Sequence, residues 1–569
     1  MYLCPQKKYL LLKKSWGFNL RKDVIGLIIG ITLIAISFPM LVAFILGIFL
    51  DDDFENSLRS FGIPIALSLI CGLFLFTRTK HQVNSRHVRD REAFVAVALA
   101  WPAVVFIGAL PYWFGGMFWG PFNDAPGVLE LIRGFVNSWF ESMSGFTTTG
   151  ATVISDRSSP ICMNDIVVFD CINSQSKGLL LWRSLTQWLG GMGIIMLGML
   201  ILSRLLGGGM NIARAELTGP TYSRIRPRIQ ETALVLWGIY ITFTVLEALI
   251  LFGLGFHPDI NMDLFDAVNH ALTTMPSGGF GTHDESIGYY DSVLVEVVIT
   301  FFMFLTGVNF TLIYFAMARD WEKLWNDEEL KLYAFVMVIA ASLMALNLVL
   351  SSKIGFGEAF RNSIFQAVSI GTSTGYSSAN FAAWPTFSTL ILLFLMVVGA
   401  SAGSTSGGLK MLRLNLAIKA GMRELSRIFN PHQIKKIRHN GESISDERLW
   451  NIFGVLILWV LLFMGSCLII ALLERGDNFD METIISVVAA SLGNTGPALG
   501  NFGPTNTWAE MHFGTLIMTS ILMWMGRLEL LTVLILIHPR TWSDDKTGEI
   551  TLFKNVRNKI KDILGKFRR

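Results

Sequence analysis

The sequence has few charges for its length of 569 residues. Only 16% of the residues are Asp, Glu, Lys or Arg, whereas 52% are hydrophobic. A soluble chain of this size would divide into several domains with much more surface charge. Apolar stretches of about 20 residues, long enough to cross a bilayer, recur along the whole chain. The composition therefore excludes a soluble protein and predicts an all-α membrane protein with many spans.

Cysteine and histidine are also scarce, which limits the chemistry that the chain can perform. The nine histidines and five cysteines show no metal-ligand spacing, and the apolar spans contain no paired carboxylates. A membrane-embedded enzyme is therefore the less favoured alternative. Cys4, Cys71 and Cys467 are scattered along the chain. Cys162 and Cys171 share one polar loop. An oxidising compartment would permit a disulfide between them, and the sequence leaves open whether they are joined or free.

The charges that are present outline a topology. Basic residues precede the first expected span, Val24–Leu50, and follow the second, about Phe61–Phe76, whereas acidic residues fill the turn Asp51–Glu55 between them. Loops rich in Lys and Arg stay on the cytoplasmic side of a membrane. The N-terminus is therefore expected in the cytoplasm and the acidic turn outside. Residues 1–92 are predicted to form a cytoplasmic N-terminus and two leader spans.

From Ala93 onward one arrangement recurs four times: a span, a short amphipathic helix, a strand of small and hydroxylated residues ending in glycine, and a second span. The four repeats are expected at residues 93–230, 231–330, 331–448 and 449–538. The first spans are predicted at Phe94–Phe114, Leu234–Phe256, Leu332–Leu350 and Ile452–Leu473, and the short helices at Leu131–Ser144, Leu264–Thr274, Phe360–Ser369 and Met481–Ser491. The second spans are predicted at Leu179–Leu205, Val293–Met317, Thr389–Lys419 and Phe513–His538. Since two spans return each repeat to the cytoplasm, all four repeats share one orientation and can surround a central pore. Inverted repeats could not place four equivalent strands around one axis.

The four glycine-ending strands carry the main functional signal. They lie within Ser144–Thr152, Thr273–Phe280, Ser369–Tyr376 and Ser491–Pro497. A ring of backbone carbonyls can replace the hydration shell of a cation, and glycine reaches the required backbone angles easily. One glycine after a short helix would be an ordinary cap, but four in the same position of a repeat predict a selectivity filter. The expected filter residues are Thr148, Thr149, Gly150, Ser277, Gly278, Gly279, Ser373, Thr374, Gly375, Asn494, Thr495 and Gly496.

Two further features predict a gate below this filter. Small residues interrupt the second span of repeat three at Gly399–Gly408, and such backbone is tolerated at membrane depth where it lines a cavity; the alternative is a close helix crossing. Arg527 lies in the last span, where a charge costs about 2.5–3.5 kcal/mol and should face protein or water. It would repel a permeant cation, and the alternative is a structural ion pair with another segment. Glu529 is a local candidate partner, although i,i+2 neighbours on a helix do not face each other. The expected gate residues are Gly403, Ser404, Thr405, Ser406, Gly407, Gly408, Lys410 and Arg527.

These features resemble the Trk/Ktr/HKT superfamily of potassium transporters, most closely its bacterial TrkH/TrkG branch. Beyond the four strands, the matching stretches are Phe140–Gly150, Gln187–Gly193, Gly403–Lys410 and Gly526–Glu529. In that family the filter glycines bind K⁺, and a serine in the first position accompanies Na⁺ permeation, so four glycines imply K⁺. The polar stretch Ser158–Lys177 is longer than the family pattern, which affects the expected shape of the outer vestibule.

The resemblance also implies the cellular role. It implies K⁺ uptake across a bacterial inner membrane, a homodimer with one pore in each subunit, and a separate cytoplasmic nucleotide-binding regulatory subunit of the TrkA type. A Na⁺-permeable or K⁺/Na⁺ symporting relative remains the alternative, and both passive and coupled transport fit the sequence. Residues 539–569 are basic with apolar residues at helical spacing, which predicts a cytoplasmic amphipathic helix on membrane lipids or a partner. No nucleic-acid partner is expected.

Overall fold

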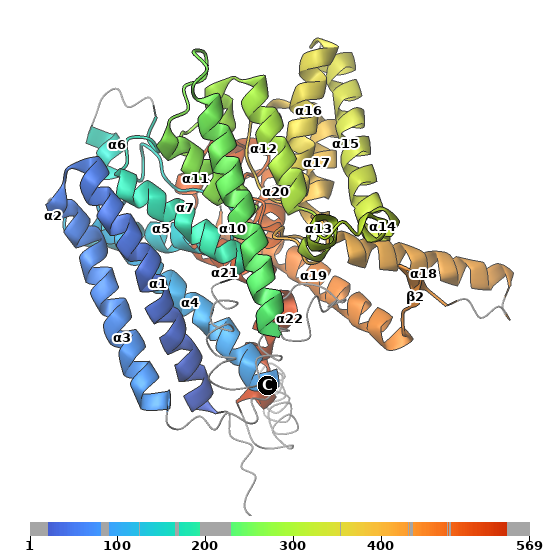
Figure 1. The fold of residues 1–569 in the computed structure, drawn as a ribbon, viewed down its shortest axis with the longest axis horizontal. Helices are drawn as coiled ribbons and strands as arrows, with labels where there is room; N and C mark the ends of the chain where they lie inside the picture. The colour runs from blue at the N-terminus through green and yellow to red at the C-terminus, as the bar shows by residue number, and fades with distance from the viewer. Residues whose placement is uncertain are drawn as a thin grey trace, which may run out of the picture.

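The protein is almost entirely helical wherever its structure is described (Figure 1). The computed structural model describes residues 21–80, 90–123, 126–164, 170–193, 229–352, 354–430, 432, 436–474, 476 and 479–542. Within these residues, six helices are long and apolar enough to cross a membrane, or eight if each of two bent helix pairs counts as one span. The β-strands of the described residues form one small antiparallel hairpin, β1 (Arg438–His439) and β2 (Glu442–Ser443). The glycine-ending strands of the four repeats are loop segments and not β-strands. The chain is a multi-pass membrane protein, and the all-α prediction is confirmed.

The two leader helices form as expected and extend beyond the predicted bounds. The first is α1 (Lys22–Asp51), and the second runs continuously through α2 (Phe54–Ser57), a π-helical turn η1 (Leu58–Gly62) and α3 (Ile63–Lys80). Figure 1 shows α1 and α3 side by side. A Cβ atom on Gly30 would lie 2.9 Å from the carbonyl oxygen of Gly72, so glycine at this crossing permits the close approach of the two helices.

The first span and the short helix of each predicted repeat are present. The long apolar helices are α4 (Asp90–Phe114), α10 (Ile229–Leu254), α15 (Glu328–Ser352) and α19 (Asp446–Leu473). The short helices are α5 (Val128–Phe146), α11 (Leu264–Thr274), α16 (Phe356–Gly371) and α20 (Met481–Gly493). The C-terminal half of each short helix is mostly buried, and the glycine-ending strand of the same repeat follows directly from that buried end.

The second spans of repeats two and four differ from the prediction. α12 (Val293–Thr306) and α13 (Phe310–Met317) meet at 104°, and α21 (Phe513–Arg527) and α22 (Leu530–Ile537) meet at 119°. The predicted spans at Val293–Met317 and Phe513–His538 are therefore bent helix pairs and not single straight helices. In the first pair, the side chain of Asn309 accepts the N–H of Thr311 at 2.8 Å and starts a new helix. In the second pair, Glu529 has a φ of 58°, which no α-helix accommodates.

The second span of repeat three is broken, as predicted. α17 (Thr386–Val398) and α18 (Met411–Phe429) are separated by a non-helical segment, called here the 399–410 loop. α18 extends away from the bundle, at the right of Figure 1. In repeat one, α7 (Lys177–Met192) starts the expected span Leu179–Leu205, of which residues 194–205 lie outside the described residues.

Short turns complete the described fold. They are α6 (Pro160–Asn164), η2 (Ser286–Tyr290), α14 (Trp321–Asn326), η3 (Phe381–Ala383), η4 (Gly500–Phe502), η5 (Trp508–Glu510) and η6 (Pro539–Thr541). The predicted basic tail falls on residues 539–569, and all but its first four residues lie outside the described part.

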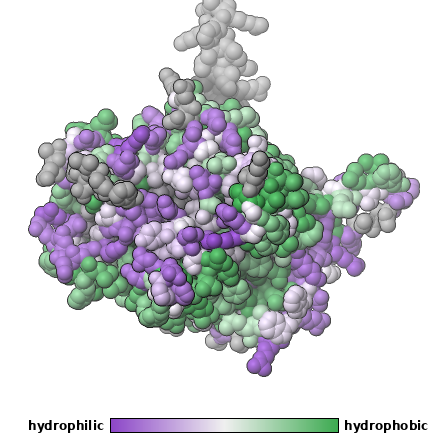
Figure 2. All heavy atoms as spheres, turned by 90° about the horizontal axis from the view of Figure 1, so that it is seen from above, coloured by the Kyte–Doolittle hydropathy of each residue, from purple (hydrophilic) through white to green (hydrophobic). Residues whose placement is uncertain are grey.

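The surface divides into a polar end and apolar flanks. Seen from the end that carries the turn between α1 and α2, hydrophilic residues spread across the face and hydrophobic residues gather on its flanks (Figure 2). Large apolar side chains on the long helices are exposed, for example Phe49, Ile70, Leu249, Leu346 and Leu468. Exposed apolar helix surfaces of this extent suit contact with lipid.

Candidate functional site

The four glycine-ending strands share one backbone conformation. In each strand, the glycine and the residue two positions before it have positive φ angles: 52° and 86° at Thr148 and Gly150, 57° and 77° at Ser277 and Gly279, 56° and 86° at Ser373 and Gly375, and 54° and 96° at Asn494 and Gly496. The residue between them donates its N–H to a carbonyl five residues earlier, over 2.8–2.9 Å, in the pairs Thr149–Ser144, Gly278–Thr273, Thr374–Ser369 and Thr495–Ala490. Such recurring αL angles at non-glycine residues are uncommon, and they mark a built site.

The four strands close into a ring. A Cβ atom would lie 2.2 Å from the Gly278 oxygen if built on Gly150, and 1.8 Å from the Thr374 oxygen if built on Gly279. On Gly375 it would lie 2.1 Å from the Thr495 oxygen, and on Gly496 it would lie 2.5 Å from the Thr149 oxygen. Each glycine thus touches the strand of the next repeat, and the fourth touches the first. All twelve predicted filter residues belong to the strands that form this ring, and at its four glycines there is no room for a side chain.

The chemistry of the ring suits a cation. The C-terminal ends of the four short helices meet the strands, and a helix C-terminus carries a partial negative charge. The strands add backbone carbonyls and the hydroxyl groups of Thr and Ser, which are hard oxygen ligands. Within the described residues, no group of three or more His, Cys, Asp or Glu could hold a metal ion. The oxygens of the ring are neutral ligands of the kind that coordinate monovalent cations.

Side chains behind the ring hold the strands in place. Gln187 of α7 donates to the carbonyl of Gly278 at 2.7 Å and accepts the N–H of Phe280 at 3.1 Å. The amide of Asn494 donates to the hydroxyl of Thr149 at 3.0 Å and to the carbonyl of Met523 at 2.9 Å. Some predicted filter groups therefore serve the scaffold: the carbonyl of Gly278 is bound by Gln187.

A buried ion pair that sequence reasoning missed joins the first two strands. The Nε of Arg183 lies 2.6 Å from a carboxylate oxygen of Glu141, and their side chains are 2% and 0% exposed. Arg183 also donates to the carbonyl of Gly281 at 2.9 Å, and Glu141 accepts the N–H of Val153 at 3.1 Å. The sequence contains a signal for this pair. Glu141 and Arg183 each interrupt a helix of otherwise apolar or small residues, and buried charges in such helices are paired.

The 399–410 loop lies against one side of the ring. The hydroxyls of Thr405 and Ser277 are 2.9 Å apart, and Gly407 donates its N–H to the hydroxyl of Ser373 at 2.5 Å. A Cβ atom on Gly407 would lie 2.0 Å from the carbonyl oxygen of Gly493. The loop therefore contacts the strands or short helices of repeats two, three and four at once.

Arg527 links this loop to α7. It ends α21 and donates to the carbonyl of Thr405 at 2.6 Å and to the carbonyls of Gly190 and Gly191 at 2.9 and 2.8 Å. Its guanidinium faces protein, and it lines a cavity of about 100 Å³ that all eight predicted gate residues share. Glu529, considered as its local partner, forms an ion pair with Arg413 of α18 at 2.7 Å, since the turn at Leu528–Glu529 directs the carboxylate there.

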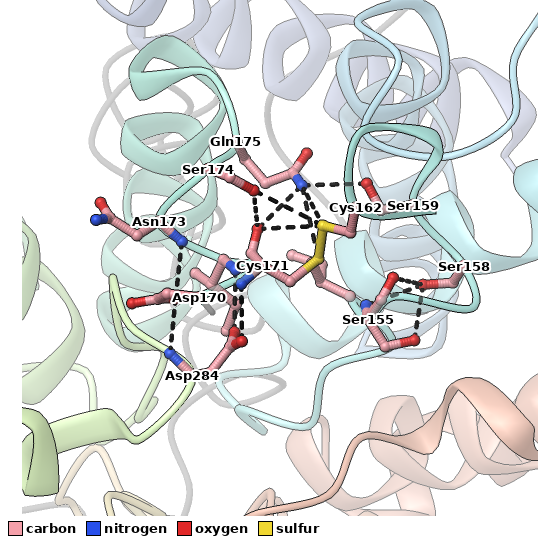
Figure 3. Close-up of a disulfide and its surroundings, with 12 residues drawn as sticks. Ser155, Ser158, Ser159, Cys162, Asp170, Cys171, Asn173, Ser174, Gln175 and Asp284 are labelled. Carbon is pink, nitrogen blue, oxygen red and sulfur yellow. Dashed lines mark hydrogen bonds between the residues drawn. A yellow bond between two sulfur atoms is a disulfide. The ribbon is translucent and has the colours of Figure 1, made fainter. Parts of the chain in front are cut away.

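The opposite side of the ring carries the disulfide. Cys162 and Cys171 are joined in the structure (Figure 3). The carboxylate of Asp284 accepts the N–H groups of Cys171 and Ile172 at 2.8 and 3.0 Å. Ile172 and Asp284 line a small cavity together with the ring glycines Gly150, Gly279 and Gly375. The polar stretch after the first strand therefore shapes the mouth of the ring.

A histidine fastens the same stretch. His283 lies 2.6 Å from a carboxylate oxygen of Asp170 and 3.5 Å from one of Asp266, and its ring stacks on Tyr289. Burial disfavours the charged imidazolium, but the hydrogen bonds and negative charges of the two aspartates outweigh it and raise the pKa of His283 to about 9. The imidazole of His283 is therefore protonated and positively charged at neutral pH.

The sequence and the fold match known transport proteins. The family model TrkH, described as a cation transport protein, matches residues 60–544. The chain is 33% identical over 528 residues to the Trk system potassium uptake protein TrkH of Escherichia coli (strain K12), covering 91% of this chain and 98% of that protein. It is 30% identical over 499 residues to TrkG of the same organism, covering 86% and 92%.

A solved structure gives the same result. The crystal structure of the potassium transporter TrkH from Vibrio parahaemolyticus matches with a TM-score of 0.75 and 30% sequence identity, covering 92% of this chain and 100% of that chain. These relatives are named as transport proteins, so a membrane-embedded enzyme is set aside. The chain belongs to the TrkH family of cation transport proteins.

Proposed function

We propose that this protein takes up K⁺ across a bacterial inner membrane through the ring of Gly150, Gly279, Gly375 and Gly496. The observation that carries the proposal is the closed ring itself, in which each glycine touches the next strand. The relatives named above are potassium uptake proteins, which supports K⁺ as the transported ion. The ion loses water at the ring and is held by carbonyl and hydroxyl oxygens, with four helix C-termini favouring its charge.

The gate in this proposal is the 399–410 loop with Arg527. The loop contacts three of the four repeats on one side of the ring, and Lys410 and Arg527 add two basic groups beside it. Positive charge below a cation filter repels the permeant ion while the loop is in place. Displacement of the loop and of the Arg527 side chain opens the path.

The orientation and partners follow from the resemblance and the charge pattern. The end with the disulfide faces outside, and both termini and the hairpin β1–β2 lie in the cytoplasm, where the basic segment Arg413–Arg438 is available to a partner. The protein forms a homodimer and associates with a nucleotide-binding regulatory subunit of the TrkA type, and its basic tail contacts membrane lipids. A Na⁺-permeable or K⁺/Na⁺ symporting transporter is the second candidate, because carbonyl and hydroxyl oxygens are hard ligands that also bind Na⁺.

Uptake of radioactive Rb⁺ into proteoliposomes tests the proposal. The purified protein should accumulate Rb⁺ against unlabelled internal K⁺, and added K⁺ should compete far more strongly than added Na⁺. Rb⁺ uptake no greater than in protein-free vesicles would contradict transport. Equal competition by Na⁺ and K⁺ would favour the second candidate, as would uptake that requires external Na⁺.

The substitution Gly150→Ser tests the ring. The new Cβ would lie 2.2 Å from the Gly278 oxygen at a φ of 86°, so the ring must shift and its fit to K⁺ weakens. We expect Na⁺ to compete with Rb⁺ in this variant. Gly454→Ser is the matched control, because a Cβ atom on Gly454 in α19 meets nothing within 4 Å. An unchanged K⁺/Na⁺ preference in Gly150→Ser would remove the first strand from the filter.

A further inference from the structure

A single carboxylate holds both ends of the 399–410 loop. One oxygen of Glu329, in the first turn of α15, accepts the N–H of Ala402 at 2.6 Å and the N–H of Leu412 at 3.0 Å. Ala402 lies near the start of the loop, and Leu412 lies just after its end, in the first turn of α18. The side chain of Glu329 is buried, at 4% exposure. One residue of a neighbouring helix thus closes the loop at its base.

No local group replaces this contact. Lys410, at the N-terminal end of α18, has a side chain that makes no capping hydrogen bond, so the first N–H groups of α18 depend on acceptors from elsewhere. Glu329 supplies one acceptor and places its carboxylate near the positive end of the helix dipole. Removing that acceptor leaves two buried N–H groups without a partner, which destabilises this position of the loop.

The residues just before Glu329 hold the hairpin β1–β2. The carboxylate of Asp327 accepts the side-chain amide of Asn440 at 2.7 Å, and the N–H of Glu328 donates to the side-chain oxygen of Asn440 at 2.9 Å. Lys419 of α18 pairs with Glu328 and also donates to the carbonyl of Arg438 at 2.8 Å. Three consecutive acidic residues therefore contact the hairpin, α18 and the loop.

We propose that Glu329 is the positioning residue of the gate, and that the segment Asp327–Glu329 couples the position of the hairpin to that of the 399–410 loop. The inference rests on the proposed function of that loop as the gate. Glu329 contacts the loop backbone and not the permeating ion. A force that moves the hairpin pulls on Asp327 and Glu328, and the adjacent Glu329 transmits this displacement to both ends of the loop.

Exposure of the loop reports its position independently of transport. Ser404→Cys is introduced into a chain with Cys4→Ser, Cys71→Ser and Cys467→Ala, which leaves only the two disulfide-bonded cysteines besides it. Its rate of modification by a charged thiol reagent is measured in proteoliposomes. Glu329→Ala should raise this rate about tenfold or more and raise Rb⁺ flux in the unstimulated state. Glu329→Gln, which keeps the shape and one acceptor oxygen, should have a smaller effect in the same direction. Glu322→Ala on α14, which has no buried residue, is the control and should change neither.

The coupling is tested by a second substitution. Asn440→Gly removes the side chain that binds Asp327 and keeps the backbone, because Asn440 has a φ of 48° that glycine accepts. It should raise the modification rate of Ser404→Cys, and it should have no further effect in the Glu329→Ala background. Fully additive effects would overturn the coupling through Glu329.

Two results separate this inference from the proposed function. If the wild-type chain transports Rb⁺ but neither Glu329 variant changes modification or flux, Glu329 does not position the loop and the inference is wrong. If the wild-type chain transports no Rb⁺, the proposed function is wrong, whereas the modification rates still show whether Glu329 holds the loop.

Discussion

The two sides of the four-strand ring are built differently. On the disulfide side, a covalent bond closes the polar stretch on itself, and His283 and Asp284 join that stretch to the segment that follows the strand of repeat two. The buried Arg183–Glu141 pair joins α7 to α5. On the other side, the 399–410 loop is held by hydrogen bonds to hydroxyls and carbonyls and by the carboxylate of Glu329.

In the proposed gating mechanism, this difference favours the loop side as the one that moves. Breaking a buried ion pair costs about 3–5 kcal/mol and removing a disulfide about 2–5 kcal/mol, whereas an ordinary hydrogen bond contributes about 1 kcal/mol. The loop also has positive φ angles at Gly399, Gly403 and Gly408, where glycine leaves the backbone free to change. In the proposed gating mechanism, the disulfide side holds the ring in shape while the 399–410 loop rearranges.

The largest expected effect comes from removing one partner of the buried ion pair. Arg183→Met leaves the Glu141 carboxylate uncompensated, so we expect a loss of about 3–5 kcal/mol of stability and little folded protein. The measurement is thermal unfolding of the protein in detergent. Arg59→Met is the control, because the Arg59–Glu55 pair is exposed and should contribute at most about 1 kcal/mol. Equal melting temperatures of the two variants would show that the pair does not stabilise the ring.

The disulfide should come next. The double substitution Cys162→Ser and Cys171→Ser opens a short loop, and we expect a loss of about 2–4 kcal/mol, seen as a lower melting temperature. A reductant should lower the melting temperature of the wild-type protein toward that of the variant and leave the variant unchanged. Cys71→Ser is the control, since Cys71 is free and exposed. A reductant effect of the same size in the variant would place the cause elsewhere.

A smaller and pH-dependent effect is expected from His283. Its pKa is raised from 6.5 to about 9, so the folded state binds the proton more tightly than the unfolded chain. The stabilisation is therefore complete below about pH 6.5 and is lost as the pH rises through about 9. The melting temperature of the wild-type protein should fall over this window relative to His283→Gln. A difference between the two proteins that stays constant from pH 6 to 9.5 would contradict the charged contact with Asp170 and Asp266.

The same comparison shows what the sequence could predict. The small residues, the four glycines and the break at Gly399–Gly408 recur or stand out along the chain, so the strands, the short helices and the broken span could be found by local pattern. Other contacts join residues that lie from 42 to 113 positions apart in the sequence. They are the Arg183–Glu141 pair, the hydrogen bond from Cys171 to Asp284 and the hydrogen bond from Ala402 in the loop to Glu329. Such pairs depend on how the helices pack. The bends at Asn309 and Glu529 were missed because apolar periodicity continues through them.

The smallest effect on stability, with the clearest effect on transport, is expected from Arg527→Ala. The carbonyls that Arg527 binds belong to Thr405, Gly190 and Gly191, and all three residues line the cavity, so water can replace the lost hydrogen bonds. The melting temperature should change by only a few degrees. Rb⁺ flux into proteoliposomes that contain this protein alone should rise, because in the proposed mechanism a positive charge is removed from the ion path and the loop loses a contact. If the variant keeps wild-type flux but loses much stability, Arg527 stabilises the structure, as the contacts on the disulfide side do, and does not act in the gate.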